Sequence, residues 1–142
     1  MESLLSLVRD LETPAIPVLQ GVLLVPLVGH IDTHRAARII QAVLDAVVHQ
    51  RAQIVIIDIT GISVVDTAIV RRIERLAHSA QLLGARTMLT GVSAAVAQTI
   101  AEQELNFSEI RTMGRLQDGV AVVLDEMRAR GHASALGNSE GS

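Results

Sequence analysis

The heptapeptide QIVIIDI, residues Gln53 to Ile59, is a short and mostly β-branched run that stays apolar up to Asp58. A strand buried on both faces of a parallel sheet has this continuous apolar pattern, whereas a half-exposed strand alternates apolar and polar residues. We therefore expect this run to be the central strand of a sheet that is covered on both faces.

The segments on either side of this strand predict an alternation of strands and helices. Two extended runs, 15–19 and 22–28, come first and join at Gln20-Gly21, a sequence typical of a hairpin turn. Pro26 lacks a backbone donor, so the second strand should lie at an edge there or carry a bulge. Further strands are expected at 86–90 and near 110–112.

Four amphipathic helices are expected between and after these strands. The first starts at Asp32 or Thr33, the second runs over about 67–83, the third over about 93–103, and the last from Leu116 to Gly131. The first two should bury these apolar residues: Ala36, Ile39, Ile40, Val43, Leu44, Val47 and Val48, then Ile69, Ile73, Leu76, Ala77, Ala80 and Leu83.

This order of elements predicts one α/β domain. The sheet should be mostly parallel, with four to five strands, an antiparallel first strand and about four helices. A chain of 142 residues has the length of one ordinary domain.

Composition excludes several classes of function. All 12 basic residues are Arg, so the lysine of a phosphate-binding loop or of a Schiff base is missing, and there is no Cys to act as a nucleophile. With a net charge of -3 and Phe107 as the single aromatic residue, the chain lacks the features of a nucleic-acid-binding protein. No cofactor is predicted.

The start of the chain and its apolar runs predict a cytoplasmic protein without a membrane span. Met1-Glu2-Ser3 does not begin a signal peptide, and the apolar runs are shorter than the roughly 18 residues that a membrane helix needs. His30 and His34 flank Asp32, but a third ligand is missing nearby, so we interpret them as a solvated pair and expect no metal site.

The residues that follow the strands are rich in Asp, Thr and Gly, and in a parallel sheet ligands usually bind at this end. Asp58, Asp66 and Thr90 could therefore serve a small-molecule-binding or catalytic α/β domain. Simpler roles are open as well: Asp66 or Thr67 as a helix cap, and Asp58 and Thr60 as residues that bond to the backbone of a loop. The glycines of a nucleophile elbow or a dinucleotide loop are absent.

Four blocks resemble successive parts of a STAS domain, the fold of anti-sigma-factor antagonists. They are TPAIPVLQGVLLVPLVGHIDTHRA (13–36), IVIIDITGISVVDTAIV (54–70), LLGARTMLTGVSAAVAQTI (82–100) and LQDGVAVVL (116–124). They are most similar to the carboxyl-terminal domain of RsbR-type stressosome proteins. The resemblance implies a non-enzymatic scaffold that binds a serine/threonine switch kinase of the RsbT type. It also implies assembly with paralogous STAS proteins of the RsbS and RsbR types, as a homodimer or a larger hetero-oligomer.

The resemblance also assigns residues. In the family the phosphorylated hydroxyl follows an Asp at the start of the helix after the central strand, which here is Thr67 after Asp66. Thr99 is the nearest counterpart of a second acceptor. We expect Val65, Asp66, Ile69 and Arg71 to contact the partner, with Arg71 one helical turn beyond Thr67.

The chain departs from the RsbR pattern at its start. Residues 1–12 resemble the end of the helix that joins a sensory domain to the STAS part, but that sensory domain is missing. The chain is then a short member, a stand-alone partner like RsbS, or a fragment; Thr rather than Ser at position 67 favours the RsbR type. We expect the STAS domain over 13–130 and a disordered tail over 131–142.

Overall fold

Five strands form a single sheet in the order β1-β2-β3-β4-β5 in the computed structural model, which describes residues 15–62, 64–103 and 110–140. They are β1 (Ile16–Leu19), β2 (Val22–Gly29), β3 (Ile54–Ile62), β4 (Arg86–Thr90) and β5 (Arg111–Thr112). β1 is antiparallel to β2, and each of the other neighbouring pairs is parallel. The predicted fold class is therefore confirmed.

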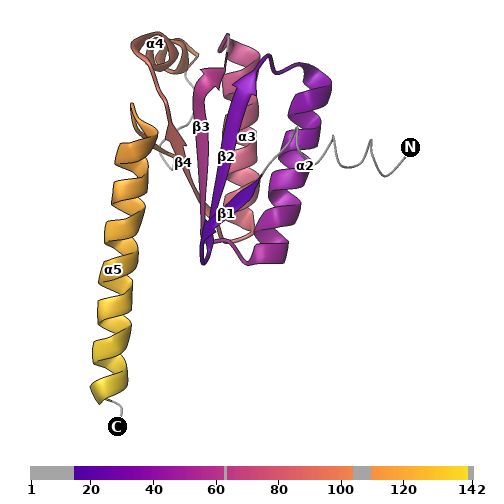
Figure 1. Ribbon diagram of the computed structural model, residues 1–142. Helices are drawn as coiled ribbons and strands as arrows, with labels where there is room; N and C mark the ends of the chain where they lie inside the picture. Colours follow the sequence, from indigo (N-terminus) through magenta and orange to yellow (C-terminus); the bar gives the residue numbers. More distant parts are fainter. Residues whose placement is uncertain (1–14, 63, 104–109, 141–142) are drawn as a thin grey trace.

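The described part of the chain has four helices: α2 (Thr33–Gln50), α3 (Thr67–Leu82), α4 (Ala94–Glu102) and α5 (Leu116–Glu140). α2 and α3 lie side by side on one face, α5 lies against the other, and α4 sits beyond the carboxyl ends of β3 and β4 (Figure 1). None of the helices in the described part of the chain is long and apolar enough to cross a membrane.

The central strand β3 is buried on both faces, as its composition predicts. Val55 and Ile57 pack into the larger apolar core beneath α2 and α3. Ile54 and Ile56 point the other way and join the smaller core around Val123 of α5. The successive side chains alternate between the two layers because a strand has a period of two residues.

A β-bulge accommodates Pro26 in β2, as one of the two sequence-based expectations had it. The register of β2 against β3 shifts between Pro26 and Val28, so the ladder is interrupted where the proline lacks its donor. β1 pairs with β2 only as far as Leu24, so Pro26 also lies beyond the end of that neighbouring strand.

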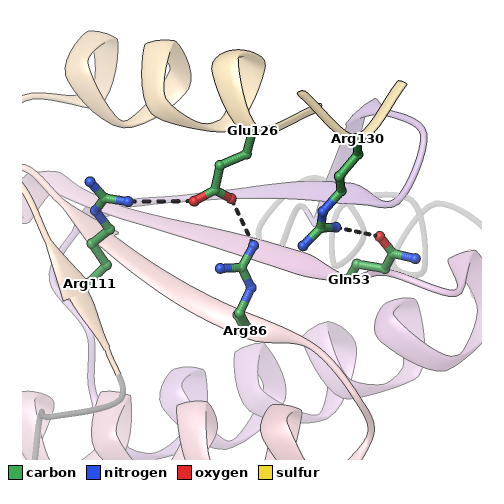
Figure 2. Close-up of polar contacts among 5 residues, drawn as sticks. All are labelled: Gln53, Arg86, Arg111, Glu126 and Arg130. Atoms are coloured by element: carbon green, nitrogen blue, oxygen red, sulfur yellow. Dashed lines mark hydrogen bonds and ion pairs between the residues drawn. The ribbon is translucent and has the colours of Figure 1, made fainter. Parts of the chain in front are cut away.

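Polar side chains of α5 contact exposed side chains of the sheet and of the residue before β3. Glu126 accepts a hydrogen bond from Arg86 of β4 at 2.8 Å and pairs with Arg111 of β5 at 3.5 Å (Figure 2). One turn further, Arg130 donates to the side-chain oxygen of Gln53 at 3.1 Å. These contacts fix the helix over the small core but are largely exposed to solvent, so each stabilises it modestly.

Three predictions about the elements are wrong. β3 does not end at Ile59 but continues to Ile62, because Gly61 and Ile62 still pair with β2. α5 does not end at Gly131 but continues to Glu140, so residues 131–140 of the expected disordered tail are helical. Val48 and Leu83 are 62% and 48% exposed rather than buried, since both lie at helix ends. The amino-terminal segment 1–12 lies outside the described residues.

Candidate functional site

The junction between β3 and α3 lies at the carboxyl end of the sheet, close to α4 (Figure 1). Asp66 is the N-cap of α3: its backbone is extended, with φ -106° and ψ 178°, and its carboxylate accepts a hydrogen bond from the Ile69 N–H at 2.9 Å. A cap of this kind satisfies one of the backbone donors that the first helical turn leaves unpaired. The capping role therefore belongs to Asp66.

Thr67 is the first residue of α3 and is half-buried. Within the described part of the chain its hydroxyl makes no hydrogen bond, since the cap is supplied by its neighbour. The amino end of a helix carries about half of a positive elementary charge, which stabilises an anion placed there. Thr67 thus combines a hydroxyl without an internal role and a location that tolerates negative charge.

Val65 and Thr99 line the same shallow surface pocket, although they are far apart in the sequence. The pocket lies between the end of β3, the loop before α3 and the helix α4, and its other lining residues are Ile59, Thr60, Ile62, Gly91, Ser93, Ala95 and Val96. The structure therefore brings Thr99 to the same end of the sheet as the Asp66-Thr67 junction. Val64, just before Val65, is 63% exposed.

The Thr99 hydroxyl differs from that of Thr67 because it already has a partner. It donates a hydrogen bond to the carbonyl of Ala95, one turn earlier in α4, at 3.0 Å. Threonines inside helices commonly make this contact. A role in the helix accounts for Thr99, which makes it the weaker of the two acceptor candidates.

The remaining candidate contact residues differ in exposure. Ile69 is only 7% exposed and belongs to the core beneath α2 and α3, so a direct contact with a partner does not fit its position. Arg71 is exposed and lines a shallow depression with Ala68, Arg72 and Arg75. Arg71, Arg72 and Arg75 form no ion pair in the described part of the chain.

Asp58 and Thr90 form a buried polar link between β3 and β4. One oxygen of the Asp58 carboxylate accepts hydrogen bonds from the hydroxyls of Thr90 at 2.7 Å and Thr60 at 3.0 Å. The expectation that Asp58 and Thr60 bond to the backbone of a loop is therefore wrong. Setting 54–58 beside 86–90 in parallel places Asp58 opposite Thr90, so strand register was the signal that could have shown the link.

The His30-Asp32-His34 cluster is part of a helix start. Asp32 caps α2 by accepting from the Arg35 N–H at 2.7 Å, and the Arg35 side chain donates to the His30 carbonyl at 2.8 Å. The backbone hydrogen bond from Arg35 lowers the pKa of Asp32 below its ordinary value. Among the described residues, no group of three potential ligands is placed to hold a metal ion.

Comparison with protein families identifies the fold. A model of the STAS domain matches residues 13–121 of this chain. The chain belongs to the STAS domain family. Its STAS domain shares 40% identity over 117 residues with the RsbT co-antagonist protein RsbRA of Bacillus subtilis, covering 82% of this chain and 43% of that protein. RsbRD of the same organism is 34% identical over 115 residues, which cover 81% of this chain and 41% of that protein. The chain thus spans about two fifths of the length of these relatives.

Solved STAS structures have the same architecture. An RsbS variant of Moorella thermoacetica superimposes with a TM-score of 0.67 at 25% identity, covering 78% of this chain and 93% of that one. The anti-sigma-factor antagonist SpoIIAA in its unphosphorylated form superimposes with a TM-score of 0.62 at 17% identity, over 76% of this chain and 92% of that one. This similarity concerns the fold alone. The predicted resemblance to STAS and RsbR-type proteins is confirmed.

Proposed function

We propose that this chain is a non-enzymatic regulatory scaffold of a partner-switching pathway in the cytoplasm. It holds a serine/threonine kinase of the RsbT type and releases it once Thr67 is phosphorylated. The similarity to proteins named RsbT co-antagonists supports this choice of partner. Paralogous STAS proteins of the RsbS and RsbR types are the expected companions, because a chain of a stressosome superimposes with a TM-score of 0.63 at 25% identity.

The observation that carries the proposal is the Thr67 hydroxyl at the start of α3, which has no hydrogen-bond partner among the residues that the structure describes. A kinase needs an exposed or readily exposed hydroxyl that does not hold the fold together. Asp66 supplies the cap, so Thr67 can be modified without loss of that hydrogen bond. The helix start also favours the added charge of about -1.5 to -2.

The surface around Thr67 explains how a phosphate could weaken docking. Val64 is largely exposed and Val65 is half-buried, so an apolar patch adjoins the hydroxyl. A partner that covers this patch removes water from it, and a dianion is costly to remove from water. Arg71 is exposed and lies four residues after Thr67, on the same face of α3, where its side chain could contact the phosphate. Phosphorylation then changes the surface and leaves the fold intact.

Intact-mass measurement after incubation with an RsbT-type kinase and ATP tests the acceptor. The wild-type chain should gain one phosphate, Thr67→Val should gain none, and Thr99→Val should behave like the wild type. Valine keeps the shape of threonine, so the two variants form a matched pair. A phosphate that persists in Thr67→Val, or that disappears only in Thr99→Val, would assign the acceptor elsewhere.

The alternative of a small-molecule-binding or catalytic site built from Asp58, Asp66 and Thr90 gains no specific support. Asp58 and Thr90 bond to each other, and Asp66 caps α3. Each of these side chains therefore has a structural role that accounts for it.

A further inference from the structure

The helix α5 covers its side of the sheet unevenly. Its contacts with the sheet are mainly with β3 and β4, where Val123 packs with Ile56 and Met88. β1 and β2 form the edge of the sheet away from β4. The side chains of these two strands that point to the α5 side are therefore covered less than those of β3.

These less covered residues form one apolar surface. Alternate residues of β2 from Leu23 to Leu27 join the core beneath α2 and α3, so the residues between and after them point to the other side. Ile16 of β1 lies opposite Leu24 and points to that side as well. We call this surface the open face; its residues are Ile16, Leu24, Pro26 and Val28.

The open face is exposed although its side chains are apolar. Val28 is 58% exposed and Ile16 is 40% exposed, while Leu24 and Pro26 are half-buried. Sheets of parallel strands are normally covered on both faces, and a contiguous exposed apolar surface marks a place where another element packs. The open face therefore calls for a cover.

The segment before β1 has the sequence pattern of a helix that could supply this cover. In MESLLSLVRDLETP, residues 1–14, the apolar residues include a set with the i, i+3, i+4, i+7 spacing of one helical face: Leu4, Leu7, Val8 and Leu11. The opposite face of such a helix is polar, with Glu2, Ser3, Ser6, Arg9 and Asp10. A helix this short is marginal in water by itself, so it needs an apolar surface to pack against.

The length and the entry point of this segment match the open face. A helix over residues 2–12 is about 16 Å long, and β2 spans about 20 Å from Val22 to Val28. Pro14 disfavours helical backbone at the residue before it, so the helix would end there and the chain can turn into β1. β1 begins at Ile16, which is itself part of the open face. The segment thus enters the fold beside the surface that it would cover.

We propose that residues 2–12 form an amphipathic helix that packs its apolar side on the open face of its own chain. This helix continues the layer of α5 over β1 and β2. The open face ends at Val28, which pairs with Gly61 near the end of β3. The helix therefore adjoins the strand that leads into the Asp66-Thr67 junction, but its packing does not depend on phosphorylation of Thr67.

Thiol labelling of the full chain tests this cover, because the chain has no Cys of its own. Val28→Cys reports on the open face. Val48→Cys is a matched control, since Val48 is 62% exposed and lies at the end of α2, on the other side of the sheet. A maleimide should label Val28→Cys about tenfold more slowly than Val48→Cys, as expected if the helix is docked about nine-tenths of the time.

Two double variants of the segment test which side of the helix makes the contact. Leu4→Ser combined with Leu11→Ser removes two apolar contacts and should raise the labelling rate of Val28→Cys to that of Val48→Cys. Arg9→Ser combined with Asp10→Ser introduces the same residue type on the polar side without changing the net charge. This control should leave the slow labelling of Val28→Cys unchanged.

Three results would overturn the proposal. The first is equal labelling of Val28→Cys and Val48→Cys in the otherwise unchanged chain, which would show that the open face is bare. The second is slow labelling of Val28→Cys that persists with both leucines replaced, or that is lost equally in the control. The third is protection that increases with protein concentration, which would assign the open face to a second copy of the chain.

Discussion

Two adjacent residues, Asp66 and Thr67, have different roles at the start of α3. Asp66 supplies the cap through a hydrogen bond of 2.9 Å, and the Thr67 hydroxyl has no partner among the described residues. From the sequence both residues were acceptable caps, and the choice depends on which of them has extended backbone geometry. The structure therefore decides a question that residue type alone leaves open.

This division predicts unequal effects of two substitutions on stability. Asp66→Ala should lower the free energy of unfolding by about 1 kcal/mol, because the Ile69 N–H loses its acceptor. Thr67→Val should change it by less than about 0.5 kcal/mol, since no hydrogen bond is lost. Urea unfolding of both variants measures the difference. Equal destabilisation by the two would show that Thr67 shares in the cap.

The buried link between Asp58 and Thr90 predicts a second contrast. Asp58→Ala leaves the Thr90 hydroxyl, which is 0% exposed, without its acceptor and should cost about 1–3 kcal/mol. Asp58→Asn keeps an acceptor oxygen at the same place and should cost clearly less. Equilibrium unfolding of both variants checks this. If both are as stable as the wild type, the link does not hold β3 to β4.

Asp32 predicts a dependence of stability on pH. Its folded pKa is lowered by the hydrogen bond from the Arg35 N–H, so its charge favours the folded state above its unfolded pKa. This contribution is lost as the pH falls through the folded pKa, that is, below about pH 4. Asn also caps helices, so Asp32→Asn removes the charge and keeps the cap.

Wild type should accordingly be more stable than Asp32→Asn at pH 7, and the gap should close as the solution is acidified. Thermal unfolding of the two proteins across the acid range measures it. A gap that stays constant down to the lowest pH would mean that the charge of Asp32 is not its source.

At the scale of elements, the strand β4 and the starts of α2, α3 and α4 could be read from the sequence, because apolar runs and Asp or Ser caps mark them directly. The end of β3 could not. Thr60-Gly61 has the composition of a turn, but pairing with Val28 and Gly29 of β2 extends the strand. Exposure at Val48 and Leu83 was also missed, since apolar spacing does not show where the sheet stops covering a helix.

The end of α5 was missed for a different reason. Gly commonly ends a helix by adopting a positive φ, as Gly84 does with φ +93° after α3. Gly131 is not among the glycines with positive φ, and α5 continues through it. Ala129, Ala133 and Ala135 surround it, and Ala is the residue with the strongest preference for helix. The helix propensity of the neighbouring alanines therefore outweighed the tendency of Gly131 to end the helix.

Two glycines of α5 provide a matched test of this helix. A Cβ on Gly119 would lie 2.7 Å from the Thr90 Cγ2 and 2.8 Å from the Met88 Sδ, so Gly119→Ala should force α5 from the sheet and cost about 1–3 kcal/mol. A Cβ on Gly131 meets nothing within 4 Å, so Gly131→Ala should stabilise the chain by about 0.5–1 kcal/mol.

Thermal unfolding and helix content by circular dichroism report both effects. Gly131→Ala should raise the melting temperature and the helical signal together, whereas Gly119→Ala should lower the melting temperature. A Gly131→Ala variant without any gain would contradict a continuous helix to Glu140. A neutral Gly119→Ala would contradict the close approach of α5 to β4.

For the whole molecule, the two ends of the sheet have different chemistry. The carboxyl end holds the Asp66-Thr67 junction beside apolar Val64 and Val65, and the amino end holds a hollow whose lining includes the polar residues Glu74, Arg75 and Gln81. The sheet and α3 join these ends into one domain (Figure 1). This arrangement fits the proposed switch, in which phosphorylation of Thr67 would change the surface at one end of the sheet and leave the fold intact.

The central claim is that phosphorylation of Thr67 releases a bound kinase, and the affinity of one kinase for both forms of the chain tests it most directly. Surface plasmon resonance with an immobilised RsbT-type kinase compares the unmodified chain, the chain phosphorylated at Thr67, and Thr67→Val as the control that cannot be modified. The unmodified chain and Thr67→Val should bind equally, and the phosphorylated chain should bind at least about tenfold more weakly. Equal affinity of the phosphorylated and unmodified chains would contradict the account.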